Sequence, residues 1–178
     1  MVVTIHHGNT TCQFIKPSYT DFMNIGIIVW SATGHTESVA QNMKKTLEQQ
    51  GHSVSFSKIA IDVDPLKRAD TYSIIEAPDS SPYDALILGA PVEAFCLSDV
   101  MKRYLTHQPA LTGKKAFYFV TQYFPKPWMG GNNSVKQIQK LAESKGAISV
   151  GKAVINWSSS SRQTQIDKAV ASVMSAFS

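Results

Sequence analysis

The amino-acid sequence predicts an α/β protein built on a doubly wound, five-stranded parallel sheet, and this prediction rests on the pattern of apolar residues and on the chain length. From residue 24 onward, apolar strand-like runs alternate with segments that have the period of an amphipathic helix. This alternation is typical of parallel strands joined by right-handed helical crossovers, and five such strands often take the order 2-1-3-4-5. The 178 residues suit a single domain with a core of ordinary size.

The five predicted strands differ in how continuous their apolar residues are. Residues 25–30 and 84–89 carry unbroken apolar runs of the kind that is buried on both faces of a sheet. Residues 53–59 alternate between apolar and polar side chains, as a strand at a sheet edge does. The last two strands are predicted at residues 115–121 and 148–156.

Helical periods separate these strands. Val39, Met43 and Leu47 recur every fourth residue, which predicts a first helix that ends at Gly51. Three further helices are predicted by a capping residue before an apolar period, and the candidate caps are Ser98, then Asn132 or Asn133, then Ser160 or Ser161. Between the second and third strands, three prolines leave room for one short helix at most, around residues 66–75.

Residues 1–22 are predicted to be an N-terminal extension, and residues 23–178 the folded domain. The extension has no helical period and lacks the basic start, apolar stretch and small-residue cleavage site of a signal peptide. It is a candidate for disorder, and Met23 is an alternative start directly before the first strand. His6 and His7 have no clustered acids or thiols to complete a metal site, so no metal is predicted.

The chain carries a mild excess of positive charge. Lys and Arg number 17 against 13 Asp and Glu, for a net charge of +4, and residues 1–22 hold one Lys and one Asp. The charge permits an anionic partner, but the basic residues are scattered rather than clustered with aromatic side chains, which argues against a nucleic-acid partner. No run approaches the ~20 apolar residues of a membrane span, and two cysteines are too few for a disulfide framework. We therefore expect a cytoplasmic protein.

Three loops of the predicted fold should meet at one end of the sheet. In doubly wound sheets, ligands bind beyond the carboxyl ends of the strands, at the switch point between the first and third strands. The loops that follow the first, third and fourth predicted strands are residues 31–36, 90–98 and 121–131. These loops are the candidate binding site.

The first loop has the composition of an anion-binding turn, with the sequence Ser31-Ala32-Thr33-Gly34-His35-Thr36. Its hydroxyl and backbone N–H groups can converge on a phosphate, and the helix that follows adds the positive end of its dipole. Gly34 permits a close backbone approach or a positive φ. The loop has no Lys or Arg and matches neither a Walker loop nor the GxGxxG turn of dinucleotide-binding folds. The alternative is an ordinary turn in which Ser and Thr only cap the helix.

This loop, placed directly after a buried strand, resembles the Ser/Thr-x-Thr-Gly-x-Thr phosphate loop of flavodoxins. In that family the loop binds the phosphate of FMN without a basic side chain. The resemblance continues through residues 84–91 to the final helix, so that it covers about residues 24–177 and is weakest between 60 and 82. It implies a flavodoxin-like fold, FMN as the cofactor, and cofactor contacts from residues 31–36.

The resemblance places the second loop beside the flavin ring, with candidate contacts from Pro91, Val92, Glu93, Ala94 and Phe95. A flat isoalloxazine ring needs apolar or aromatic surfaces, which Val92 and Phe95 offer. Many flavodoxin-like proteins carry an aromatic residue near the position of Glu93. A carboxylate beside the flavin would disfavour negative charge on the reduced ring by like-charge repulsion, unless it points to solvent.

The third loop is long and aromatic, and it supplies the remaining candidate contacts: Thr121, Gln122, Tyr123, Phe124, Trp128, Gly130 and Gly131. Its polar residues could hydrogen-bond the ribityl chain or the ring edge, its aromatic residues could stack on the ring, and its glycines allow backbone N–H groups to face a ligand. The alternative is that the aromatic side chains only pack over the end of the sheet or against the N-terminal segment. Lys126 is the one cation of the loop and could meet the phosphate of a nicotinamide cofactor.

The leading hypothesis is an FMN-binding, flavodoxin-like electron-transfer protein with redox proteins as partners. The alternative is an NAD(P)H-dependent FMN oxidoreductase that acts on quinones or similar acceptors. No catalytic acid or base stands out, as expected when the flavin carries the redox chemistry. A response-regulator receiver is disfavoured because the first and third strands do not end in acidic residues, and a flavin-free interaction module is a remote alternative. Flavodoxin carriers are typically acidic, so the charge of +4 departs from the family pattern.

Overall fold

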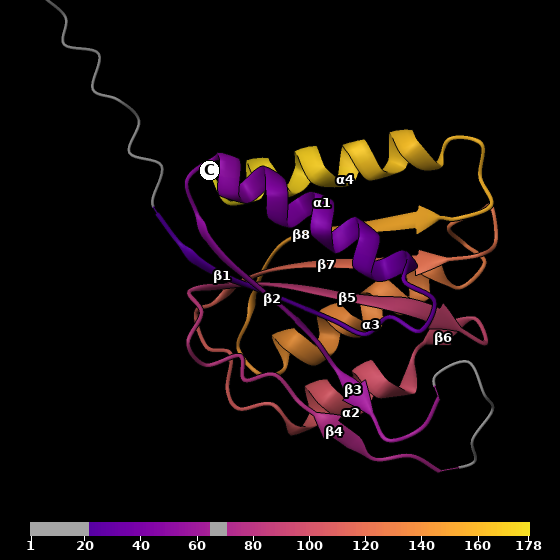
Figure 1. The fold of residues 1–178 in the computed structure, drawn as a ribbon, viewed down its shortest axis with the longest axis horizontal. Coiled ribbons are helices and arrows are strands. Elements are labelled where there is room, and N and C mark those ends of the chain that lie inside the picture. Colours follow the sequence, from indigo (N-terminus) through magenta and orange to yellow (C-terminus); the bar gives the residue numbers. More distant parts are fainter. Residues whose placement is uncertain (1–21, 65–70) are drawn as a thin grey trace, which may run out of the picture.

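The computed structural model describes residues 22–64 and 71–178, and a five-stranded parallel sheet forms its centre (Figure 1). In spatial order the strands are β2 (Ser53–Lys58), β1 (Asn24–Val29), β5 (Ala85–Glu93), β7 (Lys115–Gln122) and β8 (Ile148–Asn156). Counted along the chain, these parallel strands have the order 2-1-3-4-5, and the predicted fold class is confirmed. Their bounds agree closely with the predicted strands, except that β5 continues further.

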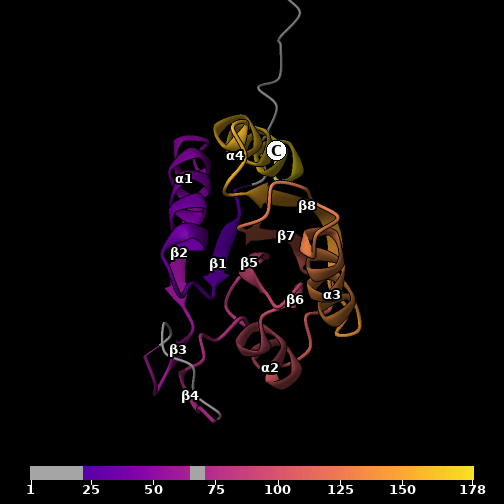
Figure 2. The ribbon, with the colours of Figure 1, turned by 90° about the vertical axis from the view of Figure 1, so that its right-hand side faces the viewer.

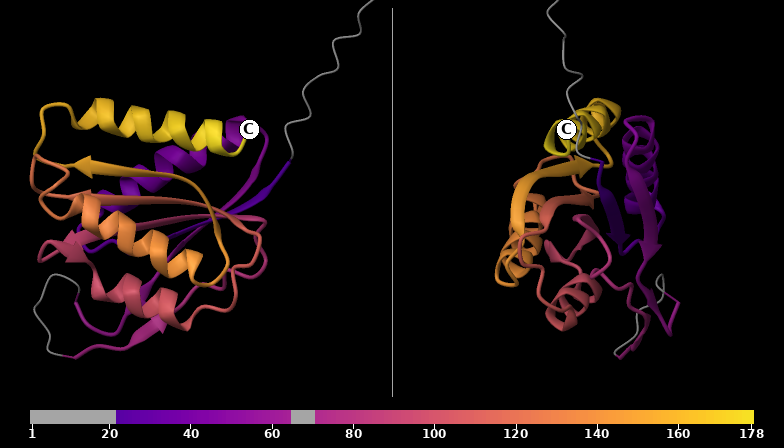
Figure 3. Two further views of the ribbon diagram at one scale, coloured as in Figure 1. Left: turned by 180° about the vertical axis from the view of Figure 1, so that it is seen from behind. Right: turned by 90° about the vertical axis from the view of Figure 1, so that its left-hand side faces the viewer.

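Helices cover both faces of the sheet, as Figures 2 and 3 show. On one face lie α1 (His35–Gln49) and α4 (Arg162–Ala176), and on the other lie α2 (Asp99–His107) and α3 (Gly131–Glu143). Ile25 and Ile27 pack in the core under α1 and α4, while Ile28 packs in the core under α2 and α3. Because successive strand residues point to opposite faces, a strand covered on both sides is apolar throughout.

The second loop is mostly a hairpin. β5 continues to Glu93, which pairs antiparallel with Cys96 of β6 (Cys96–Leu97). The two residues between them, Ala94 and Phe95, have positive φ angles of 46° and 62°. Tight two-residue turns need this left-handed geometry, which Asn and Gly usually supply. An Ala-Phe pair carries no such signal, and the sequence therefore predicts an open loop here.

The connection between β2 and β5 is described over residues 59–64 and 71–84. Residues 60–64 and 71–76 of it lie beside α2, and we call them the arm. In the arm, β3 (Ala60–Ile61) and β4 (Ile74–Glu76) pair antiparallel as a separate two-stranded sheet (Figure 2). The sequence left room for one short helix at most around residues 66–75; residues 71–75 contain no helix, and residues 65–70 lie outside the described part. Paired β-branched residues favour a strand, but the strand that β4 pairs with is distant in sequence.

The starts of the later helices agree with the sequence in part. Ser161 is the N-cap residue of α4, as predicted. Ser98 is the N-cap residue of α2, although its hydroxyl makes no capping hydrogen bond. The N-cap of α3 is Gly130, so neither Asn132 nor Asn133 caps that helix. Gly130 has a φ of 107°, a backbone geometry that glycine adopts at no steric cost.

The predicted extension lies almost wholly outside the described residues, and with it His6 and His7. Of residues 1–22 only Phe22 is described, and its side chain is exposed. Within the described ranges, no helix has the length and apolar character needed to cross a membrane. In the same ranges, no three His, Cys, Asp or Glu side chains come together as a metal site.

Candidate functional site

The three predicted loops meet at the carboxyl ends of β1, β5 and β7 (Figure 1). A cleft of about 260 Å³ opens there, and residues of all three loops line it: Ala32, Thr33, His35, Pro91, Val92, Glu93, Thr121, Gln122 and Tyr123. The other predicted contact residues lie outside this lining: Ser31, Gly34, Thr36, Ala94, Phe95, Phe124, Trp128, Gly130 and Gly131. The topology therefore gathers about half of the predicted residues around one space.

The first loop leads into a helix start whose backbone is open to a ligand. Gly34 is the N-cap of α1 with a φ of 83°, and no other group lies within 4 Å of where its Cβ would be. The first four N–H groups of a helix have no partner within the helix. One of them, that of Glu37, donates to Ser31 Oγ at 3.3 Å. Those of Gly34, His35 and Thr36 have no acceptor in the described structure and are available to an anion.

A buried hydrogen bond joins the first loop to the third. Thr36 Oγ1 and Thr121 Oγ1 lie 2.8 Å apart, and the two residues are 1% and 3% exposed. The bond holds the start of α1 against the end of β7. Of the three hydroxyls expected near a phosphate, those of Thr36 and Ser31 therefore have partners within the protein, while Thr33 lies exposed at the cleft.

Glu93 lies at the end of β5 and turns its carboxylate toward the end of β1. Its Oε1 accepts a hydrogen bond from Trp30 Nε1 at 3.1 Å. Partial burial raises the pKa of Glu93, the Trp30 hydrogen bond opposes this, and the negative charge of Asp99 adds to it. Although much of the side chain is exposed, the carboxylate is held by the protein instead of pointing freely into solvent.

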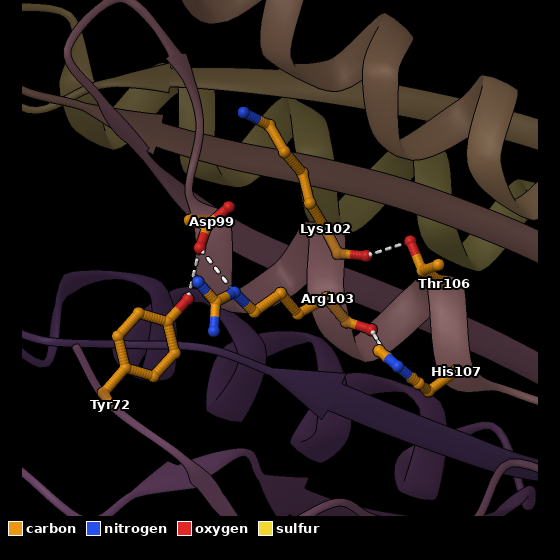
Figure 4. A network of polar contacts seen from close by, with 6 residues as sticks. All are labelled: Tyr72, Asp99, Lys102, Arg103, Thr106 and His107. Atoms are coloured by element: carbon orange, nitrogen blue, oxygen red, sulfur yellow. Dashed lines mark hydrogen bonds and ion pairs between the residues drawn. The ribbon is translucent and has the colours of Figure 1, made fainter.

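A polar network fastens the arm to α2 beside Glu93 (Figure 4). The Tyr72 hydroxyl donates to Asp99 Oδ2 at 2.7 Å, and Arg103 Nε donates to the same oxygen at 2.7 Å. The guanidinium of Arg103 also lies 4.5 Å from the centre of the Tyr72 ring. The hydrogen bond from Tyr72, with the charge of Arg103, holds the pKa of Asp99 below its ordinary value. The network therefore keeps a negative charge close enough to Glu93 to act on it.

Gln122 uses its amide to shape the third loop. Its Nε2 lies 3.1 Å from Phe124 O, 2.6 Å from Lys126 O and 2.6 Å from Asn156 Oδ1. Its Oε1 is buried without a hydrogen-bond partner among the described residues, and a Cβ at Gly131 would lie 2.8 Å from it. The amide donors that could have bonded a flavin edge are therefore already engaged with the loop.

Four aromatic residues of the second and third loops are exposed: Phe95, Tyr123, Phe124 and Trp128. The first three contact one another beside the cleft, and we call them the aromatic ledge. Phe95 and Phe124 stack with their ring centres 5.1 Å apart, and Tyr123 meets Phe124 edge-on. Of the four, Tyr123 lines the cleft. Tyr123 and Trp128, at 73% and 74% exposed, are not packed over the end of the sheet, whereas Phe124, at 38%, is partly covered.

Trp157 and Arg162 join the site from a fourth loop that the sequence analysis did not single out. The Trp157 indole stacks on the His35 ring, with 3.9 Å between ring centres and 18° between planes. The guanidinium of Arg162 lies 4.8 Å from the centre of the indole. Partial burial and the charge of Arg162 lower the pKa of His35. A tryptophan before four serines is typical of a loop. The signal that could have placed Trp157 in the site is its position directly after the last predicted strand, at the same end of the sheet as the other three loops.

Comparisons with known proteins identify the architecture. No family model and no curated protein matches the chain. A flavodoxin from Streptococcus pneumoniae aligns with a TM-score of 0.62 and 16% identity, over 85% of this chain and 98% of its own. Flavodoxin 1 from Bacillus cereus has a TM-score of 0.63 and 21% identity, over 86% of this chain and 96% of its own. The two-electron reduced flavodoxin of Megasphaera elsdenii has a TM-score of 0.63 and 21% identity, over 85% and 98%. The fold is flavodoxin-like.

The residues that the flavodoxin-like fold brings together fit a phosphate-bearing ligand with a flat ring. The open N–H groups at the start of α1 suit a phosphate, and the position of Gly34 lets it approach the backbone. Val92 and Tyr123 give the cleft an apolar wall. The volume of about 260 Å³ is small for a ligand pocket, so a ligand of the size of FMN would extend beyond the cleft.

Proposed function

We propose that the protein binds FMN in this cleft and carries electrons between redox proteins. The observation that carries the proposal is the start of α1, where a left-handed Gly34 and three open N–H groups adjoin a cleft with apolar walls. Phosphate binds at such a helix start without a basic side chain, and a flavin ring needs the flat apolar surface beside it. The flavodoxin-like fold supports the same placement.

The protein's own residues have distinct roles in this proposal. The N–H groups of Gly34, His35 and Thr36 would hold the phosphate, and Val92 and Tyr123 would flank the ring. When bound, FMN supplies the redox chemistry. The protein orients the ring at the carboxyl end of the sheet and limits its contact with water. No side chain has to move a proton for a carrier to work.

Glu93 is proposed to tune the flavin. Its carboxylate lines the cleft and is held there by Trp30. Negative charge beside the ring opposes the gain of negative charge on reduction. The Glu93→Gln variant keeps an oxygen for Trp30 and removes the charge, so we expect its FMN midpoint potential to be less negative than that of the wild type. An equal or more negative potential in the variant would contradict this role.

A titration with FMN tests the proposal. We expect the flavin-free protein to quench FMN fluorescence on binding, and to bind riboflavin more weakly because riboflavin lacks the phosphate. Gly34→Val places a branched side chain at positive φ in the phosphate loop, and we expect it to weaken FMN binding about tenfold or more. Gly113→Val is the matched control, because Gly113 has a φ of 76° and open space around its Cβ but lies at the other end of the sheet.

The outcomes separate the hypotheses. Loss of FMN affinity in the Gly34 variant but not in the Gly113 variant supports the proposed phosphate site. Equal affinities in both variants would overturn the assignment of the loop. A wild-type protein that binds no FMN would overturn the proposed function and leave a flavin-free interaction module in its place.

A second candidate function is an NAD(P)H-dependent FMN oxidoreductase acting on quinones or similar acceptors. The aromatic ledge favours it, because Phe95 and Phe124 stack next to Tyr123 of the cleft, where they could hold a nicotinamide ring. Lys126 of the same loop could meet a phosphate of that cofactor. Steady-state NAD(P)H oxidation by the FMN-loaded protein, with a quinone and no added reductase, distinguishes the two functions. Sustained turnover decides for the enzyme, and its absence for the carrier.

A further inference from the structure

Three side chains from two strand-to-helix connections lie together beside the proposed phosphate site. His35 is the first residue of α1, Trp157 follows β8, and Arg162 is the first residue of α4. The Trp157 ring stacks on His35 at 3.9 Å, and Arg162 lies over the same indole at 4.8 Å. We call this group the His-Trp-Arg stack.

Two backbone hydrogen bonds, one through its N–H and one through its carbonyl, hold Trp157 in place. Its N–H donates to Gln122 O at 2.7 Å, which ties it to the end of β7. Its carbonyl accepts a hydrogen bond from Arg162 Nη1 at 3.0 Å. The indole is therefore a fixed surface, and His35 rests on it with nearly parallel rings. Stacking against a fixed surface orients the first residue of α1, whose N–H is one of the open donors.

Arg162 brings a positive charge to a site whose phosphate loop has none. The loop from Ser31 to Thr36 contains no Lys or Arg. Arg162 forms no ion pair within the described residues, so no carboxylate there neutralises it. Its charge reaches the loop, because it contributes to the lowered pKa of His35. The starts of α1 and α4 also lie at the same end of the sheet (Figure 1).

We propose that Trp157 and Arg162 are an extension of the phosphate-binding loop, in which Trp157 orients the start of α1 through His35 and Arg162 attracts the phosphate dianion. The inference rests on the proposed FMN site and adds its selectivity. A flavin that carries a phosphate gains from the charge of Arg162, whereas riboflavin does not. The stack thus favours flavin phosphates and other phosphate monoesters over neutral flavins.

The proposal includes a proton-linked effect at His35. A phosphate dianion beside the ring favours its protonated form, which opposes the effect of Arg162. Among the described residues, the other charged or titratable groups of this helix start and cleft are Glu37, which is ion-paired with Lys58 of β2, and Glu93 and Tyr123, which line the cleft. We therefore expect FMN affinity to rise as the pH falls from about 8.5 to about 6.5. Lower values are avoided because a phosphate monoester loses its second charge near pH 6.

The test compares the dissociation constants of FMN and riboflavin in matched variants. We expect Arg162→Gln to weaken FMN binding about 3- to 20-fold, as one unit charge acting on a dianion across a partly screened surface can do, and to leave riboflavin unchanged. Arg162→Lys should keep most of the affinity for FMN. Lys168→Gln removes the same charge from an exposed position of α4 away from the stack and should change neither ligand.

The role of Trp157 has its own pair of variants. Trp157→Phe keeps an aromatic surface for His35 and should bind FMN nearly as the wild type does. Trp157→Leu removes that surface and should weaken FMN more than riboflavin and flatten the pH dependence of FMN binding. If Trp157→Leu fails to fold, the comparison of Arg162→Gln with Lys168→Gln still tests the part of the proposal assigned to Arg162, because both positions are exposed.

The failure of this inference is distinguishable from failure of the proposed function. A wild-type protein without FMN affinity would overturn both. A wild-type protein that binds FMN, with an Arg162→Gln variant that changes FMN and riboflavin equally or not at all, would overturn the inference and leave the FMN site intact. An FMN affinity that is independent of pH between about 6.5 and 8.5 would overturn the part assigned to His35.

Discussion

The buried hydrogen bond between Thr36 and Thr121 predicts a strongly coupled pair of mutations. The two Oγ1 atoms lie 2.8 Å apart, and the residues are 1% and 3% exposed. Thr→Val keeps the branched shape of the side chain and removes the hydroxyl. In Thr36→Val or Thr121→Val alone, the remaining hydroxyl stays buried and loses its partner.

The expected magnitudes follow from this burial. Leaving one hydroxyl unpartnered in the core costs about 1–3 kcal/mol, whereas replacing both partners by apolar groups of the same shape is nearly neutral. We therefore expect each single variant to lose about 1–3 kcal/mol and the double variant to be close to the wild type. For a domain of this size the melting temperature of each single variant should fall by roughly 2–4 °C per kcal/mol.

Urea unfolding of the flavin-free protein, followed by circular dichroism, measures the free energies of unfolding. Thr106→Val is the control, because Thr106 is exposed and such a substitution usually changes stability by less than about 0.5 kcal/mol. Additive losses in the double variant would refute the coupling, as would two single variants as stable as the control. FMN affinity is a separate readout, since the double variant restores stability without restoring the Thr36 hydroxyl.

Three further predictions test other parts of the site and core. Partial burial raises the pKa of Glu93 above its ordinary value of 4.5. The folded protein therefore binds the proton of this carboxyl group more tightly than the unfolded chain does. At neutral pH, where the group is ionised, its charge destabilises the fold. Glu93→Gln keeps an acceptor for Trp30 and should raise the urea midpoint at pH 7, by less as the pH falls toward 4.5, and an unchanged midpoint at pH 7 would contradict this. Gly89→Ala would place a Cβ 2.2 Å from Cζ of the buried Phe119 ring and should cost about 1–3 kcal/mol or more in thermal unfolding, so an unchanged melting temperature would contradict the packing. Gln122→Met removes the amide that bonds two carbonyl groups of the third loop, and limited proteolysis should then cut that loop faster, whereas an unchanged cleavage rate would show that the amide does not hold it.

The strands and helices are predictable because their signals are local, and the strand order was expected because five-stranded doubly wound sheets often take it. Ile25, Ile27 and Ile28 follow one another closely and are all fully buried, which happens only when helices cover both faces of the strand. Val39 and Met43 mark the buried side of α1 through their spacing alone. Gly34 has a positive φ, which is one of the two properties that the sequence analysis expected a glycine to permit in this turn.

The contacts that build the site are not local, and no sequence pattern encodes them. Thr36 and Thr121 are 85 residues apart in the chain, and Trp30 and Glu93 are 63 apart. Each pair meets only because parallel strands align their carboxyl ends at one edge of the sheet. The turn at Ala94 and Phe95 could not be predicted from its residue types either, because the hairpin forms through the pairing of β6 with the end of β5.

By itself, the sequence determined the class of fold, and it predicted the common strand order of such sheets and a phosphate-binding loop without a cation. Only the tertiary structure decided which hydroxyls of that loop are engaged, which group the carboxylate of Glu93 bonds, and that Arg162 lies over the Trp157 ring that stacks on His35. The predicted phosphate loop contains none of the chain's Lys or Arg residues, and the proposed role of Arg162 would bring one of these charges to it. The physical reason is that burial repeats along a strand or helix with a fixed period, whereas a contact between loops exists only once the whole sheet has assembled.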